Sequence, residues 1–74
     1  MSYVSSSIPA EVFRIIRLKN SPDGNPRYDI YTSKGTFRTQ NDSHAAYQNP
    51  EAWVGKTITL HLSDHGQVSS VDLP

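Results

Sequence analysis

The sequence predicts an all-β fold, a small five-stranded antiparallel barrel. Residues 27–33 and 56–63 alternate apolar and polar side chains at the period of a half-buried strand. Turn-forming residues cluster at 20–26 and 64–67, and a tight Lys34-Gly35 turn separates two short strand-like segments. A chain of 74 residues has room for one small domain.

The start of the chain is the least regular part of the pattern. Residues 1–9 are rich in serine and end in proline, so we expect a flexible N-terminal arm before a single domain over 10–74. Residues 10–19 suit a helix by their Pro-Ala-Glu start, but their β-branched and aromatic content favours a strand. A β-bulge at Ile15-Ile16 would bring the apolar side chains into phase, and we therefore favour a bulged strand over a helix.

The next segments predict a hairpin. Pro22-Asp23-Gly24 has the residues of a tight turn, since proline presets φ and glycine accepts a positive φ. Tyr28, Ile30 and Thr32 should then share the inner face of one strand. The returning strand, residues 36–39, should place Phe37 inward and Arg38 outward.

Residues 40–55 interrupt the strand pattern. Asp42 or Ser43 can cap a short helical turn that ends at Tyr47, and Asn49 can cap a second turn that begins at Pro50. We expect Tyr47 and Trp53 to fill one end of the core. In the last two strands, 56–63 and 68–73, the inward side chains should be Ile58, Leu60, Leu62, Val71 and Leu73. The full predicted core is Phe13, Ile15, Leu18, Tyr28, Ile30, Phe37, Ile58, Leu60, Leu62 and Val71.

The order of elements favours one barrel type. Three strands, a short helical turn and two further strands are typical of an OB-like barrel. An SH3-like barrel is the rival, because its helical turn falls before the last strand instead.

Several short segments resemble a known group of proteins. These are the run from Arg14 to Lys19, GNPRY at 24–28, GTFRT at 35–39, NP at 49–50 and the strand pair over 56–73. They are similar to small uncharacterised all-β proteins encoded by phages of actinobacteria, over about residues 12–73. The resemblance implies a phage-encoded protein in the cytoplasm of a bacterial host, and it implies no particular activity.

Composition excludes several functional classes. The chain has no cysteine, which excludes disulfides, thiolate zinc sites and a cysteine nucleophile. It has no P-loop, GxGxxG or GxSxG motif, so we expect neither an enzyme nor a cofactor. His44, His61 and His65 invite a metal site, but His61 falls on a strand and His65 in a turn, so we predict none. No apolar run is long enough for a membrane span or a leader, and the Met1 start predicts a complete cytoplasmic protein.

Charge is distributed unevenly along the chain. The net charge is zero, but residues 1–38 carry six basic and three acidic side chains, whereas residues 39–74 carry one and four. The bulged strand would gather basic residues and one tyrosine on one outer face, and these are Arg14, Arg17, Lys19, Arg27, Tyr31 and Arg38.

These six residues are a candidate nucleic-acid or anion face, and the sequence as a whole fits two functions. The neutral charge and small size favour a binding module that docks on a host or phage protein or forms a homo-oligomer. The alternative is single-stranded nucleic acid bound through the basic face of the first three strands, with a base stacked on Tyr31. No membrane partner is expected.

Overall fold

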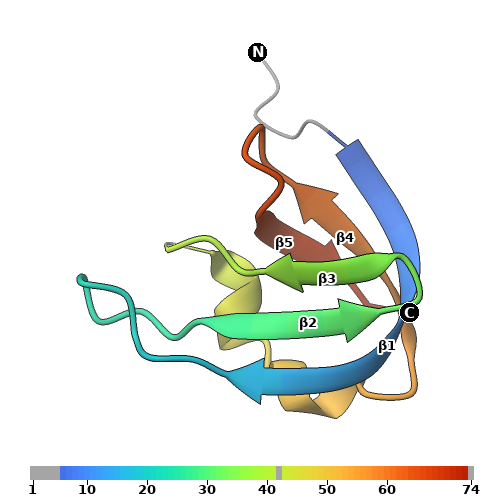
Figure 1. The fold of residues 1–74 in the computed structure, drawn as a ribbon, viewed down its shortest axis with the longest axis horizontal. Helices are drawn as coiled ribbons and strands as arrows, with labels where there is room; N and C mark the ends of the chain where they lie inside the picture. The colour runs from blue at the N-terminus through green and yellow to red at the C-terminus, as the bar shows by residue number, and fades with distance from the viewer. Residues whose placement is uncertain (1–5, 42, 74) are drawn as a thin grey trace.

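The computed structural model describes residues 6–41 and 43–73, which form an all-β fold around one five-stranded antiparallel sheet (Figure 1). Neighbouring strands follow the order β3-β2-β1-β4-β5. Two short 3-10 helices, η1 and η2, lie between β3 and β4. The elements are β1 Ser6–Arg17, β2 Tyr28–Thr32, β3 Gly35–Arg38, η1 His44–Tyr47, η2 Pro50–Trp53, β4 Thr57–Leu62 and β5 Val68–Asp72.

The long first strand is shared by both halves of the sheet. Residues 6–11 of β1 pair with β4, and residues 12–17 pair with β2. Figure 1 shows β1 curving, so that β2 and β3 lie on one side of the core and β4 and β5 on the other. The prediction of a strand instead of a helix at 10–19 is confirmed for residues 10–17, whereas Leu18 and Lys19 follow the end of β1. Ser6–Pro9 of the predicted arm belong to β1, and residues 1–5 lie outside the described part.

The bulge in β1 lies earlier than predicted. Val12 pairs with Thr32 and Arg14 with Tyr31, so Phe13 is the extra residue, and the prediction of a bulge at Ile15-Ile16 is wrong. The bulge falls where β1 leaves β4 and joins β2, a point at which the strand must bend. There the Val12 backbone bonds to the segment that follows η2, donating to the Lys56 carbonyl at 2.9 Å and accepting from the Gly55 N–H at 2.8 Å.

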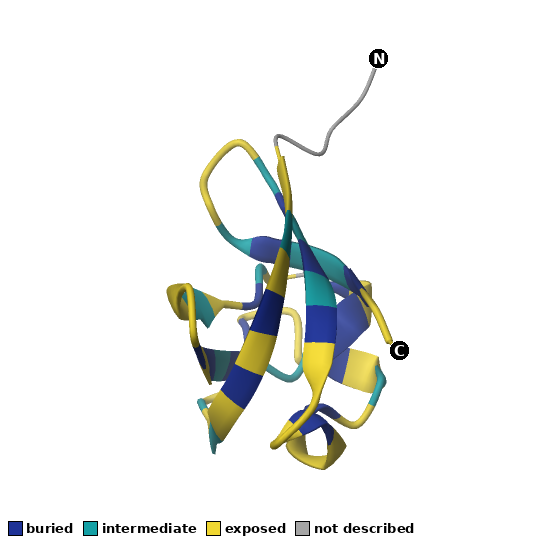
Figure 2. Ribbon diagram, turned by 90° about the vertical axis from the view of Figure 1, so that its right-hand side faces the viewer, coloured by how far each residue is buried: buried dark blue, intermediate teal, exposed yellow. Residues whose placement is uncertain are grey.

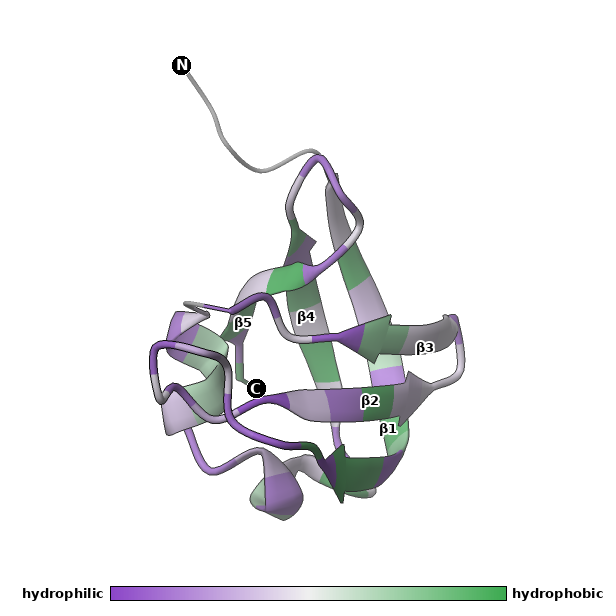
Figure 3. Ribbon diagram, turned by 60° about the vertical axis from the view of Figure 1, so that its left-hand side comes forward, coloured by the Kyte–Doolittle hydropathy of each residue, from purple (hydrophilic) through white to green (hydrophobic). Residues whose placement is uncertain are grey.

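The core lies between the two halves of the sheet. Figures 2 and 3 show buried and apolar positions alternating with exposed and polar ones along the strands. Of the predicted core, Tyr28, Ile30, Ile58, Leu60, Leu62 and Val71 are buried, and Ile15 and Phe37 are partly buried against them. Leu18 is half-buried outside this cluster. Phe13 is 57% exposed, and its place in the predicted core is wrong, because the bulge keeps it out of the inward alternation.

A second register shift changes the inward residues of β5. Leu62 pairs with Val68 and His61 with Ser70, so Ser69 is an extra residue in β5. Val68 and Val71, three positions apart, are therefore both buried. The inward prediction for Leu73 is wrong, since β5 ends at Asp72 and Leu73 is 47% exposed.

The two 3-10 helices begin at the predicted residues. Ser43 caps η1, where its hydroxyl accepts from the Ala45 N–H at 3.2 Å; the other candidate cap, Asp42, lies outside the described residues. Asn49 precedes Pro50 in a left-handed conformation with φ 54° and makes no capping hydrogen bond through its side chain, so that capping prediction is wrong. Trp53 is buried as predicted, whereas Tyr47 is exposed, with its hydroxyl 2.6 Å from the side-chain oxygen of Asn25.

The two edges of the sheet meet at one described point. Past the end of β3, Thr39 forms a parallel bridge with Val68, and the Gln40 N–H donates to the Val68 carbonyl at 3.0 Å. The sheet does not close into a barrel, so the barrel prediction is not confirmed. Among the described residues, no helix has the length and apolar character needed to cross a membrane.

Candidate binding face

The outer side of β1, β2 and β3 gathers two rows of side chains. Direct cross-strand partners project from the same side of a sheet. One row is therefore Arg14, Tyr31 and Thr36, and the next is Ile16, Asp29 and Arg38. Phe13 lies beside Arg14 at the bulge. We call these seven residues the aromatic face.

Two aromatic side chains are exposed on this face. Phe13 is 57% and Tyr31 37% exposed, and Ile16 is half-buried. Because Arg14 and Tyr31 are direct partners and Phe13 precedes Arg14, two aromatic rings and one guanidinium come from adjacent positions. Sequence reasoning missed Phe13, because only the position of the bulge decides on which side of β1 it lies.

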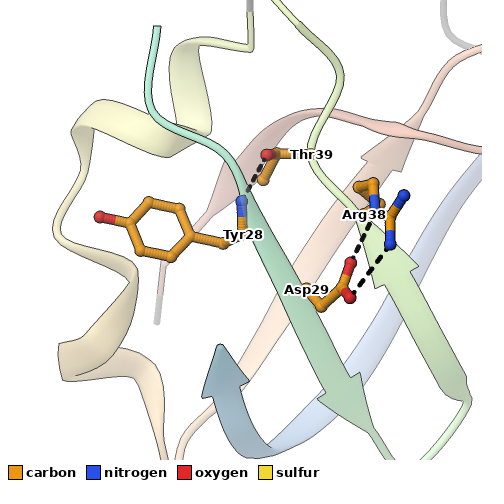
Figure 4. Close-up of polar contacts among 4 residues, drawn as sticks. All are labelled: Tyr28, Asp29, Arg38 and Thr39. Atoms are coloured by element: carbon orange, nitrogen blue, oxygen red, sulfur yellow. Dashed lines mark hydrogen bonds and ion pairs between the residues drawn. The ribbon is translucent and has the colours of Figure 1, made fainter. Parts of the chain in front are cut away.

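The charges of the aromatic face largely cancel. Arg38 donates from Nε to Asp29 Oδ1 at 2.8 Å and from one terminal nitrogen to Oδ2 at 3.3 Å (Figure 4). These hydrogen bonds, and then the carboxylate charge, raise the pKa of Arg38 above its ordinary value. Arg14 has no ion-pair partner among the described residues. The face therefore carries one uncompensated positive charge.

The structure brings together only three of the six predicted site residues. Arg14, Tyr31 and Arg38 share the aromatic face. Arg17 pairs with Tyr28, one position beyond the Ile16–Asp29 pair. Its side chain therefore faces the other side of the sheet and does not converge with Arg14. Figure 4 shows the Tyr28 ring pointing away from the Asp29–Arg38 pair.

Arg17 is instead held by its neighbours. Its guanidinium lies 5.2 Å from the centre of the Tyr28 ring and donates to the Tyr28 hydroxyl at 3.1 Å. It also donates to the side-chain oxygen of Asn20. Lys19 and Arg27 lie in the loop between β1 and β2, outside the two rows, and the Nε of Arg27 is buried without a partner in the described structure.

The histidines do not assemble a metal site in the described part of the chain. No group of three or more histidine, aspartate or glutamate side chains there could hold an ion. Both ring nitrogens of His61 are engaged, one with Ser7 and the other with Asp72. The described residues also enclose no pocket.

The aromatic face can bind an extended or flat surface but cannot enclose a small molecule. Its rings offer stacking and apolar contact, and Arg14 offers a charge-assisted hydrogen bond. Neither a nucleophile–base pair nor a metal-ligand set lies among its residues. Comparison with protein-family models, curated proteins and solved structures found no match to this chain, so the interpretation of the site rests on its geometry.

Proposed function

We propose that the protein is a small binding module that docks on a protein partner through the aromatic face. The observation that carries the proposal is the adjacent exposure of Phe13, Arg14 and Tyr31 at the bulge of β1. Aromatic residues and arginine are the side chains that most often dominate binding energy at protein interfaces. A rigid sheet also holds them at little cost in conformational entropy.

The balance of charge favours a protein over a nucleic acid. With Arg38 paired to Asp29, Arg14 is the one arginine of the face that is free to contact a phosphate. Breaking the exposed ion pair would free Arg38 for a second phosphate contact. Two phosphate contacts provide little of the electrostatic energy on which nucleic-acid binding depends. The chemistry of the face instead matches an apolar protein surface with one carboxylate opposite Arg14.

A second candidate function is single-stranded nucleic-acid binding, and the strand order favours it. The order β3-β2-β1-β4-β5, the 3-10 helices before β4 and the Thr39–Val68 bridge match the connectivity of an OB-like barrel. OB-like proteins bind oligonucleotides on the face of their second and third strands. Phe13 and Tyr31 would then stack on successive bases.

One cross-linking experiment separates these functions. A photoreactive phenylalanine analogue replaces Tyr31 in the full chain, which is irradiated in the cells that produce it, and adducts are digested with protease or nuclease. We expect adducts with another polypeptide. Adducts with nucleic acid would support the second candidate, and adducts between two copies of the chain would identify the partner as a second copy.

The control places the same analogue at Val54, which is 49% exposed after η2 and lies outside the aromatic face. A partner of the face cross-links from position 31 and not from position 54, and Phe13→Ser abolishes that adduct. Equal adducts from both positions, or none from position 31, would overturn the proposal.

A further inference from the structure

A chain of hydrogen bonds joins three side chains on the other half of the sheet. Ser7 Oγ lies 2.8 Å from His61 Nδ1, and His61 Nε2 lies 2.8 Å from Asp72 Oδ2. The three residues come from β1, β4 and β5. Ser7 and His61 are direct cross-strand partners, and Asp72 pairs with Thr59, two positions before His61. This arrangement is separate from the aromatic face and plays no part in its proposed function.

When His61 is neutral, the chemistry of the three groups determines which atom donates in each hydrogen bond. An ionised carboxylate only accepts hydrogen bonds, so His61 Nε2 carries the ring proton and donates to Asp72. The lone pair of Nδ1 then accepts from the Ser7 hydroxyl. This is the order of nucleophile, base and orienting carboxylate found in activated serines, with the two imidazole nitrogens exchanged.

The three hydrogen-bonded side chains are at least partly exposed, so reagents in solution can reach Ser7. Ser7 is exposed, the His61 side chain is 22% exposed, and the Asp72 side chain is 74% exposed. The described residues enclose no pocket beside Ser7. A substrate would therefore be small and intrinsically reactive, because the protein contributes little energy for binding it.

We propose that Ser7 is an activated nucleophile that takes an acyl group from small activated esters, with His61 as its general base. Ser7 Oγ attacks the ester carbonyl and its proton passes to His61 Nδ1. The carbon–oxygen bond to the leaving group breaks, and the proton on Nδ1 neutralises the departing alkoxide or phenoxide. Water then hydrolyses the acyl-serine and regenerates the hydroxyl. Asp72 is a positioning residue that holds the ring with Nδ1 toward Ser7.

The test is acetylation of the full chain by p-nitrophenyl acetate near neutral pH. We expect intact mass and peptide mapping to place an acetyl ester on Ser7 before any other serine. Hydroxylamine should remove it, since that reagent cleaves esters and leaves acetylated lysines intact. Ser7→Ala should abolish the ester, and His61→Gln should slow its formation by about a hundredfold or more, since general-base effects begin near that size.

Matched variants separate activation from simple accessibility. Ser70→Ala removes a hydroxyl directly opposite His61 that makes no hydrogen bond to the ring, and His65→Gln removes a histidine in the exposed β4–β5 turn. In both variants, Ser7 should be acetylated at the same rate as in the parent protein. Asp72→Asn should slow labelling, and Asp72→Glu should restore it, with overlapping melting curves for all variants. Acetyl esters spread evenly over the serines, or Ser7 labelling unchanged in His61→Gln, would overturn the proposal.

Discussion

Two large aromatic residues, Trp53 and Phe13, occupy opposite environments in this small protein. Trp53 is 1% exposed and packs in the core cluster, as the sequence predicted. Its indole Nε1, however, is buried without a hydrogen-bond partner among the described residues. A buried polar group without a partner costs about 1–3 kcal/mol. Trp53 therefore stabilises the fold through packing, despite its polar atom.

Substitution of Trp53 should separate these two contributions. Trp53→Ala should lower the free energy of unfolding by about 3–5 kcal/mol. Trp53→Phe should cost less than half as much, because loss of the unpaired N–H offsets part of the lost packing. Urea denaturation followed by far-ultraviolet circular dichroism measures both. Equal losses in the two variants would show that the indole N–H is hydrogen-bonded.

The exposed Phe13 leads to the opposite expectation. Phe13→Ser should change the free energy of unfolding by no more than about 0.5 kcal/mol, as is usual for surface substitutions. Leu60→Ala, at a fully buried core position, should cost about 2–5 kcal/mol and serves as the reference. The same urea titrations apply. A loss at Phe13 comparable to that at Leu60 would show that the ring packs in the core.

Among the elements, local alternation predicted β2 and β4 well, because each strand keeps one register along its length. Tyr28, Ile30 and Thr32 of β2 are buried as expected. β1 and β5 each carry an extra residue, and a shift of one residue moves later side chains to the other face. The bulge at Phe13 lies next to backbone hydrogen bonds between Val12 and residues more than forty positions later in the chain, Gly55 and Lys56. No local pattern encodes that contact.

The bulge in β1 also decides how much of the candidate site could be predicted. Arg14, Tyr31 and Arg38 were recognised, because their positions follow from alternation within the β1–β2–β3 meander. Arg17 was assigned to the wrong side, because the predicted bulge lay beyond Arg14 instead of before it. The sequence did not predict the hydrogen bonds that join Ser7, His61 and Asp72. They depend on the pairing of β1 with β4, which are far apart in the sequence.

A pair of deletions tests the bulge directly. Deleting Phe13 should leave Val12 inward, Arg14 outward and Ile15 inward, since it removes only the extra residue. Deleting Thr59 from β4, whose described pairing with β1 is regular, should turn Leu60 out of the core. We therefore expect a cooperative thermal transition after deletion of Phe13 and none after deletion of Thr59, both followed by circular dichroism. Loss of the transition in both would contradict the assigned register.

At the scale of the whole molecule, the net charge is zero, but the two halves of the sheet have different outer surfaces. The half built from β3, β2 and the end of β1 presents aromatic rings and arginine, and the half built from the start of β1, β4 and β5 presents serine, threonine and histidine. The segment after β3 meets β5 at the Thr39–Val68 bridge and the hydrogen bond from the Gln40 N–H to the Val68 carbonyl. The halves are joined by β1 and by the shared core between them, and their outer surfaces lie on opposite sides of that core.

The number of arginines on the aromatic face limits how any single-stranded nucleic acid would bind. Each phosphate contact contributes about −0.7 to the slope of log K against log salt, so Arg14 and Arg38 together allow a slope no steeper than about −1.4. Fluorescence anisotropy of a labelled oligothymidine, titrated at several salt concentrations, measures this slope. Arg14→Gln should halve it, and Arg17→Gln, on the other side of the sheet, should leave it unchanged. A slope near −3 would mean that Arg17 and Arg27 also reach the strand, and it would favour nucleic acid over protein as the natural partner.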